Sequence, residues 1–181
     1  MDDSPEISLV RRRFLEAHGA SVRPAFGSYV HVTRAERPRA ALGYCRAGSE
    51  PLFLERYLDA PVEQAVSAAT GRPAARESII EIGNLAADDA FAMIELWGSV
   101  ANDLGAGCEI AVATLTAPLR AMFARIGVPL VVLGSAVAER ADDPEAWGHY
   151  YARDPQVCAG VIAQGQQAIA AFLARRRRSA A

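Results

Sequence analysis

The chain has 181 residues, of which 51% are hydrophobic and 22% charged, so it holds enough apolar material for one folded domain and is not a disordered chain. Its formal net charge is −2, which lacks the basic excess typical of nucleic-acid binders. All 19 Lys and Arg positions are arginine, which excludes Schiff-base lysine chemistry, a pyridoxal-phosphate anchor and a Walker A lysine. The cysteines and histidines are scattered without CxxC or HExxH, so neither a metal site nor a disulfide framework is expected.

The chain is expected to open with a helix over 5–18. Ser4 and Pro5 fit the N-cap and first helical position, and Gly19 fits the C-terminal cap. The residues expected to face inward are Val10, Phe14 and Leu15. Two strands over 28–33 and 40–46, joined by a polar turn at 36–38, follow from alternating hydrophobicity.

The rest of the chain alternates between strand and helix. Two short helical pieces are predicted within 50–76. They are followed by a strand over 78–85, a helix capped by Asp88 and Asp89 that runs to Leu104 and is broken by Gly105, a strand over 109–114, a helix from Thr116 to Gly127 and a strand over 130–133. The buried face of the first of these longer helices is expected to hold Ile94, Trp97, Val100 and Ala101. This order predicts one α/β domain over 1–181 whose sheet has parallel character.

The two ends of the chain bear on the compartment. Residues 155–174 carry no charge, but glutamines and glycines make them too polar for a membrane span, so we expect a strand and then a helix with a basic tail over 175–181. The acidic start, Met1–Asp3, does not resemble a signal peptide. We therefore expect a cytoplasmic protein without a transmembrane segment.

Three phrases occur in a fixed order: Leu52–Glu63, Glu81–Ala86, and Trp147–Tyr151 followed by Pro155. They resemble the bacterial family named thermostable hemolysin, and the resemblance extends from about Gly19 to Gly165. The family name implies one possible function, a membrane-active cytolytic protein without enzymatic activity.

A more distant resemblance covers residues 28–134. An arginine before a strand with an inner glutamate, then a helix, then a strand ending in threonines is similar to GNAT-type N-acyltransferases, and most of all to acyl-homoserine-lactone synthases. Here the pattern reads Arg76, Glu81, the helix after Asp89, and Val112–Thr116. The resemblance implies a GNAT-like domain with a central mixed, twisted sheet and helices on both faces. It also implies that strands 78–85 and 109–114 are parallel neighbours that splay apart to receive a pantetheine arm. The implied activity is transfer of an acyl group from a thioester to a small amine or amino acid, and a noncatalytic protein of the same fold is the third alternative.

Glu81 is the catalytic candidate, because a carboxyl group among isoleucines should have a raised pKa and can act as a base. The alternative is a structural ion pair with Arg76. Asn84 would face away from Glu81 in a regular strand unless a bulge at Gly83 changes this. The substrate-binding candidates are Asn84, Leu85, Arg76, Glu55, Tyr57, Glu63, Thr114, Trp147 and Tyr151; core packing is the alternative for the aromatic ones.

The sequence departs from the GNAT pattern at one point, and this departure predicts which molecule donates the acyl group. Ala86–Ala90 stands where those enzymes place a glycine-rich loop for the coenzyme A diphosphate, and Asp88 and Asp89 would repel that group. The co-substrate expected is therefore phosphopantetheine on an acyl carrier protein rather than free acyl-coenzyme A, with no bound cofactor. Arg11–Arg13 or Arg175–Arg178 are the candidate docking residues for an acidic carrier. The tyrosine acid typical of GNAT enzymes is missing from 116–122.

Overall fold

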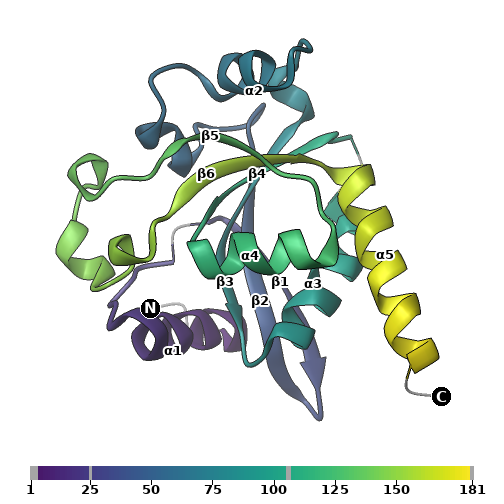
Figure 1. Ribbon diagram of the computed structural model, residues 1–181. Coiled ribbons are helices and arrows are strands. Elements are labelled where there is room, and N and C mark those ends of the chain that lie inside the picture. The colour runs from purple at the N-terminus through teal and green to yellow at the C-terminus, as the bar shows by residue number, and fades with distance from the viewer. Residues whose placement is uncertain (1–3, 25, 105–106, 180–181) are drawn as a thin grey trace.

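The computed structural model describes residues 4–24, 26–104 and 107–179 (Figure 1). Its elements, in chain order, are α1 (Pro5–His18), β1 (Ser28–Arg34), β2 (Arg37–Arg46), η1 (Phe53–Tyr57), α2 (Val62–Thr70), η2 (Arg76–Ser78), β3 (Ile79–Ala87), α3 (Ala90–Leu104), β4 (Ile110–Leu115), α4 (Ala117–Ile126), β5 (Val131–Ser135), η3 (Ala138–Arg140), η4 (Pro144–Trp147), η5 (Tyr151–Arg153), β6 (Gln156–Val161) and α5 (Ile162–Ser179). The predicted strands and helices are confirmed to within a few residues. The predictions for Met1–Asp3, for Gly105 and for the side chains of Val100 and Ala101 lie outside the described residues.

Six strands form one mixed sheet in the order β1-β2-β3-β4-β6-β5. Among the described residues, β3 and β4 pair in parallel and the other four pairings are antiparallel. The alternation of strand and helix in the second half predicts parallel character, but β6 returns between β4 and β5 and pairs antiparallel with both. The mixed sheet expected from the GNAT resemblance is confirmed.

Helices cover both faces of the sheet (Figure 1). Alternate residues of β3 face opposite sides. Ile79 packs with Val62 and Val66 of α2, whereas Ile80 and Leu96 of α3 belong to the core on the other face. The first face carries α1, η1 and α2, and the second carries α3, α4 and α5.

The parallel strands β3 and β4 separate after a short paired stretch. Their register runs from Ile79 opposite Ile110 to Glu81 opposite Val112 and stops there, although β3 continues to Ala87 and β4 to Leu115. The predicted divergence of the two strands at their C-terminal ends is confirmed. It leaves backbone groups of both strands unpaired with each other beyond Glu81.

Two local predictions are wrong. Leu15 is 61% exposed rather than inward, because it follows Phe14 by one residue and lies about 100° further round the helix. The hairpin turn lies at Ala35 and Glu36, both with positive φ, and not at 36–38. This two-residue geometry matches the right-handed twist of β1 and β2, so β2 begins already at Arg37.

Candidate active site

A cavity opens on the first face of the sheet, where β3 and β4 part. Its walls come from α1, η1, the ends of β3 and β4, and the segment around Trp147 and Tyr150. Six of the predicted site residues line it: Tyr57, Glu81, Asn84, Leu85, Thr114 and Trp147. The fold thus brings together six predicted residues that are spread over the chain from Tyr57 to Trp147, 90 positions apart.

Glu81 is the buried carboxyl group of this cavity. It is 2% exposed, and its Oε1 accepts a hydrogen bond of 3.1 Å from the backbone N–H of Leu54 in η1. Burial raises the pKa of Glu81 to about 8, and the backbone N–H groups of Phe53 and Leu54 offset this only in part. The carboxyl group of Glu81 thus titrates within about one pH unit of neutrality, as a general acid or base requires.

Three buried polar atoms on the cavity wall have no hydrogen-bond partner within the described residues. They are Oε2 of Glu81, Oγ1 of Thr114 and Nδ1 of His18. Buried polar groups in native proteins almost always have partners, and exceptions gather at sites that complete their bonds with a ligand or water. Three such atoms around one cavity mark it as the candidate functional site.

A β-bulge places Asn84 on the same cavity as Glu81. Asn84 has φ of 48°, and the β2–β3 register shifts between Ala41 and Gly43, so two residues of β3 lie opposite one of β2. Asn84 Nδ2 donates to the Tyr29 hydroxyl at 2.6 Å. A regular strand would turn Asn84 to the opposite face, and the bulge removes that separation.

Phe26 explains why β3 carries glycine next to the bulge. A Cβ atom at Gly83 would overlap the Phe26 ring, and one at Gly43 would lie 2.7 Å from Phe26 Cβ. Any larger residue would displace the ring, which itself lines the cavity. The sequence analysis interprets Gly83 as a bulge signal and does not find Phe26.

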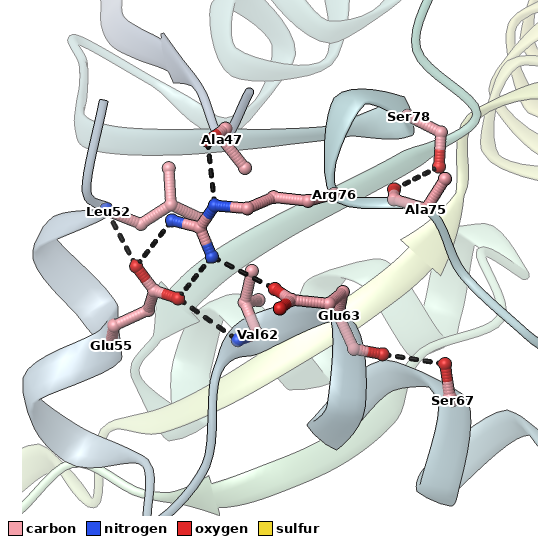
Figure 2. A network of polar contacts seen from close by, with 9 residues as sticks. All are labelled: Ala47, Leu52, Glu55, Val62, Glu63, Ser67, Ala75, Arg76 and Ser78. Carbon is pink, nitrogen blue, oxygen red and sulfur yellow. Dashed lines mark hydrogen bonds and ion pairs between the residues drawn. The ribbon is translucent and has the colours of Figure 1, made fainter. Parts of the chain in front are cut away.

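Arg76, Glu55 and Glu63 form a polar network and are not among the residues that line the cavity (Figure 2). Arg76 makes ion pairs with Glu55 at 2.6 Å and Glu63 at 2.9 Å, rather than with Glu81. The hydrogen bond from Arg76 is the main cause that lowers the pKa of Glu55 to about 2. The ion-pair alternative for Glu81 is therefore not what the structure shows.

Aromatic side chains form the wall opposite the sheet. The Trp147 and Tyr150 rings lie 5.1 Å apart, and Tyr150 stacks against Phe14 of α1 at 6.3 Å. Tyr151 is not among the cavity residues, and its hydroxyl contacts that of Tyr57 at 2.7 Å. These rings therefore pack against one another, and those of Trp147 and Tyr150 also border the cavity.

The N-terminal helix contributes residues that the sequence analysis misses. Phe14 and His18, one helical turn apart, both line the cavity, and Arg23 follows them. Burial, and after it the charge of Arg153, lowers the pKa of His18 and so favours its neutral imidazole. Their spacing of four residues was the available signal, but nothing in the sequence indicated which part of the sheet the helix covers.

The two aspartates at the start of α3 behave differently from each other. Asp89 accepts a hydrogen bond from the Ala92 N–H at 2.8 Å and so caps the helix, as predicted. Asp88 instead pairs with Arg12 at 2.9 Å and with Arg39 at 3.1 Å. The expectation that both carboxylates satisfy helix N–H groups is wrong for Asp88, because two arginines lie within its reach.

A groove continues from the cavity past the start of α3. Phe14, His18, Leu85, Thr116 and Leu119 border both hollows, and the groove adds three arginines and one aspartate: Arg13, Arg125, Arg153 and Asp89. The arginines of the C-terminal tail lie in the last turn of α5, on the other side of the molecule from α1 (Figure 1). The groove thus has a net positive lining close to the candidate site.

A second cavity lies on the opposite face, between the sheet and the helices α3, α4 and α5. Its lining is almost wholly apolar and includes Ile80, Ile82, Ala113, Phe123 and Ile169. Ile82 also borders the first cavity. β3 therefore lies between the two hollows near the point where it leaves β4.

Two further observations concern chemistry away from these cavities. Cys45, Cys108 and Cys158 are buried free thiols, and the described residues contain no group of three or more metal-ligating side chains suited to an ion. Across the same residues, no helix combines the length and apolar character that crossing a bilayer requires.

Solved structures of the same architecture define the fold class. The chain matches the acyl-homoserine lactone synthase LasI with a TM-score of 0.63 at 13% identity, over 91% of this chain and 85% of that one. It matches FeeM, an N-acyl amino acid synthase from uncultured soil microbes, with a TM-score of 0.59 at 14% identity, over 90% and 92%. It matches the coenzyme A-dependent acyl-homoserine lactone synthase BjaI with a TM-score of 0.63 at 16% identity, over 94% and 80%. The chain has the GNAT-like α/β fold of these synthases.

A match to a family model shows the sequence family of this chain. The model of the Thermostable hemolysin family matches residues 3–166, and the chain belongs to that family. Among curated proteins, none is similar enough to this chain to match. The family resemblance carried by the three phrases of the sequence is therefore confirmed.

Proposed function

We propose that this protein transfers an acyl group from a carrier-bound thioester to the amino group of a small amine or amino acid. The observation that carries the proposal is Glu81, a buried carboxyl group with one oxygen lacking a partner within the described residues, set where β3 and β4 part. The names of structures with this fold add support, since they describe synthases of N-acyl amino acids and acyl-homoserine lactones.

The chemistry assigns one proton to Glu81. The amine nitrogen attacks the thioester carbonyl carbon, a C–N bond forms, and the C–S bond breaks. The Glu81 carboxylate takes the proton that the neutral amine loses and passes it to the departing thiolate, which leaves as a thiol and restores the carboxylate. With a pKa of about 8, roughly a tenth of this group is in the base form at pH 7, and an ammonium group beside it would favour the charged form further.

The unpaired ends of β3 and β4 fit the donor arm. Beyond Glu81 the two strands no longer bond to each other, so a pantetheine chain would lie between them and bond to their backbone through its amides. Such bonds would hold the thioester in line with Glu81 and the acceptor amine. In β4 the carbonyl groups of Thr114 and Leu115 already accept hydrogen bonds from Tyr150 and Arg120.

We propose a carrier protein rather than free coenzyme A as the donor. Asp89 already occupies an N–H group at the start of α3, which weakens that helix end as a diphosphate site. Arg13, Arg125 and Arg153 in the adjoining groove offer a complementary surface to an acidic carrier. Calorimetry with coenzyme A and with the acylated carrier tests this: micromolar binding of coenzyme A would contradict it.

The apolar cavity beyond β3 is our site for the acyl chain. Its lining suits a hydrocarbon, and Ile82 of β3 borders both this cavity and the catalytic one. The acyl chain would pass from one to the other beyond Glu81, where β3 and β4 no longer pair. Ala113→Leu adds bulk to this lining, so we expect shorter acyl chains among the products. An unchanged chain-length distribution would place the acyl group elsewhere.

The central experiment supplies the protein with acylated carrier protein and a mixture of amines and amino acids, and follows N-acyl products by mass spectrometry. We expect Glu81→Gln to lower the rate roughly 10²–10⁴-fold, the range that a general base contributes. Glu63→Gln, in the polar network beside η1, is the matched control and should retain activity. Absence of any N-acyl product, or an unchanged rate in Glu81→Gln, would refute the proposal.

A further inference from the structure

We infer that Arg76, through its fork on Glu55, is a positioning residue that holds the Leu54 N–H against Glu81. The inference rests on the proposed function in treating Glu81 as the base. It gives Arg76 and Glu55 a role other than substrate binding. Both act through η1, the short helical segment that reaches Glu81.

Arg76 connects three parts of the fold at the entrance to β3 (Figure 2). Its Nε donates to the carbonyl of Ala47, just beyond the end of β2, at 2.9 Å. Its Nη1 and Nη2 donate to the two carboxylate oxygens of Glu55 at 2.6 and 2.9 Å. Nη1 also donates to Glu63 of α2 at 2.9 Å. A planar guanidinium group with a fixed fork can hold all three partners at once, which a point charge cannot.

Glu55, held by Arg76, in turn binds the backbone on both sides of η1. Its two oxygens accept hydrogen bonds from the N–H groups of Leu52 and Val62, each at 3.0 Å (Figure 2). Leu52 precedes η1 in the chain and Val62 follows it. Leu54 lies between these two anchors, is fully buried, and donates its N–H to Glu81 Oε1 at 3.1 Å. The chain of contacts therefore begins at the residue that leads into β3 and ends on a side chain of β3.

The charges around Glu81 decide how the pH response is interpreted. Besides Glu55, the titratable or charged groups that face it are Arg56 from η1, Cys45 from the adjacent strand and, across the cavity, His18, Arg23, Tyr57 and Tyr150. Arg76 itself is not among them. Removing Arg76 leaves all of these groups in place, withdraws the N–H donor from Glu81 and leaves Glu55 without its cation. Both changes act in one direction and raise the pKa of Glu81.

Proton–nitrogen NMR of the Leu54 amide tests the inference without any need for turnover. In the unaltered protein the Leu54 amide shift should follow the titration of Glu81, with a midpoint near pH 8, and Glu81→Gln should abolish that response. Arg76→Met should raise the midpoint by about one pH unit and reduce the amplitude of the Leu54 response at least about twofold, since the donor is withdrawn. Arg76→Lys should reduce the amplitude to the same extent, because an ammonium group lacks the fork, and should raise the midpoint less, because it keeps the charge beside Glu55.

Glu63→Gln is the matched control, because Glu63 pairs with the same guanidinium but accepts no N–H group from the η1 backbone. It should leave midpoint and amplitude unchanged. A normal Leu54 response in folded Arg76→Met or Arg76→Lys would overturn the inference, and so would a Leu54 amide that ignores Glu81. If Arg76→Met does not fold, Arg76→Lys decides. A normal titration without N-acyl products would refute the proposed function alone.

Discussion

Two glutamates near η1 have opposite environments. Glu55 has a 20% exposed side chain, an arginine on both oxygens and two backbone N–H donors, and its pKa is lowered to about 2. Glu81 is 2% exposed, has no partner for Oε2 within the described residues, and its pKa is raised to about 8. The same functional group is thus held as a permanent anion in one place and as a titrating acid in the other.

The difference lies in the supply of partners as well as in burial. A carboxylate with four or more donors is a structural element, because its charge is offset inside the protein. A buried carboxyl group with one unpaired oxygen weakens the fold, and proteins keep such groups where a ligand completes them. The comparison therefore separates the part of the molecule that holds the site from the part that reacts.

The largest expected effect is on how stability depends on pH at Glu81. The folded pKa of about 8 lies above the ordinary value of 4.5, so the folded chain keeps a proton that the unfolded chain loses. The stability that protonated Glu81 retains in the folded chain is present in full below about pH 4.5 and is lost as the pH rises through about 8. Glutamine does not titrate, so Glu81→Gln does not lose stability in this way. The free energy of unfolding of the variant, relative to that of the unaltered protein, should therefore increase by about 3–5 kcal/mol between pH 4 and pH 9.

Urea unfolding at several pH values measures this. Since all other groups titrate alike in the two proteins, their difference isolates Glu81. Parallel stability curves for the two proteins would show that Glu81 titrates like an exposed glutamate, and the contrast with Glu55 would be lost.

The second effect concerns the network and has the opposite sign. The lowered pKa of Glu55 gives stability that is present above pH 4.5 and is lost as pH falls toward 2. Because Arg76 and Glu55 are 28% and 20% exposed, solvent screens part of their attraction. Arg76→Met should lower the free energy of unfolding at pH 7 by roughly 1–3 kcal/mol and flatten its fall between pH 5 and pH 2.

Arg140→Met provides the comparison for that experiment. It breaks an ion pair with Asp59, whose side chain is 90% exposed, so the cost should stay within about 0.5 kcal/mol. Equal losses in Arg76→Met and Arg140→Met would mean that the network is no more than a surface ion pair.

The sequence could predict the reacting part better than the part that holds it. Glu81 stands among isoleucines in a clear strand pattern, so its burial and raised pKa follow from local composition. The pairing of Arg76 with Glu55 joins charged residues 21 positions apart, and no periodicity indicates which acid an arginine will meet. His18 reaches the cavity from a helix 63 residues before Glu81 (81 minus 18), a contact that only the packing of α1 on the sheet determines. The bulge at Asn84 was foreseen as a possibility, but its geometry depends on the register with β2.

The smallest expected effect is the difference in stability between two variants that each lose one hydroxyl group. Ser67 lies beside the polar network, and Thr114 lines the cavity. Ser67 Oγ donates to the Glu63 carbonyl at 2.6 Å and accepts the Ala74 N–H at 2.9 Å, so Ser67→Ala should cost about 1 kcal/mol. Thr114 Oγ1 is buried without a partner in the described part of the chain, so Thr114→Val removes an unsatisfied group and should change stability by less than about 0.5 kcal/mol, or raise it slightly. Thermal unfolding of both variants measures this, and the rate of product formation should fall in Thr114→Val while Ser67→Ala retains it. A Thr114→Val protein that loses as much stability as Ser67→Ala would mean that the hydroxyl already has a structural partner, and the cavity would then have one fewer group to offer a substrate.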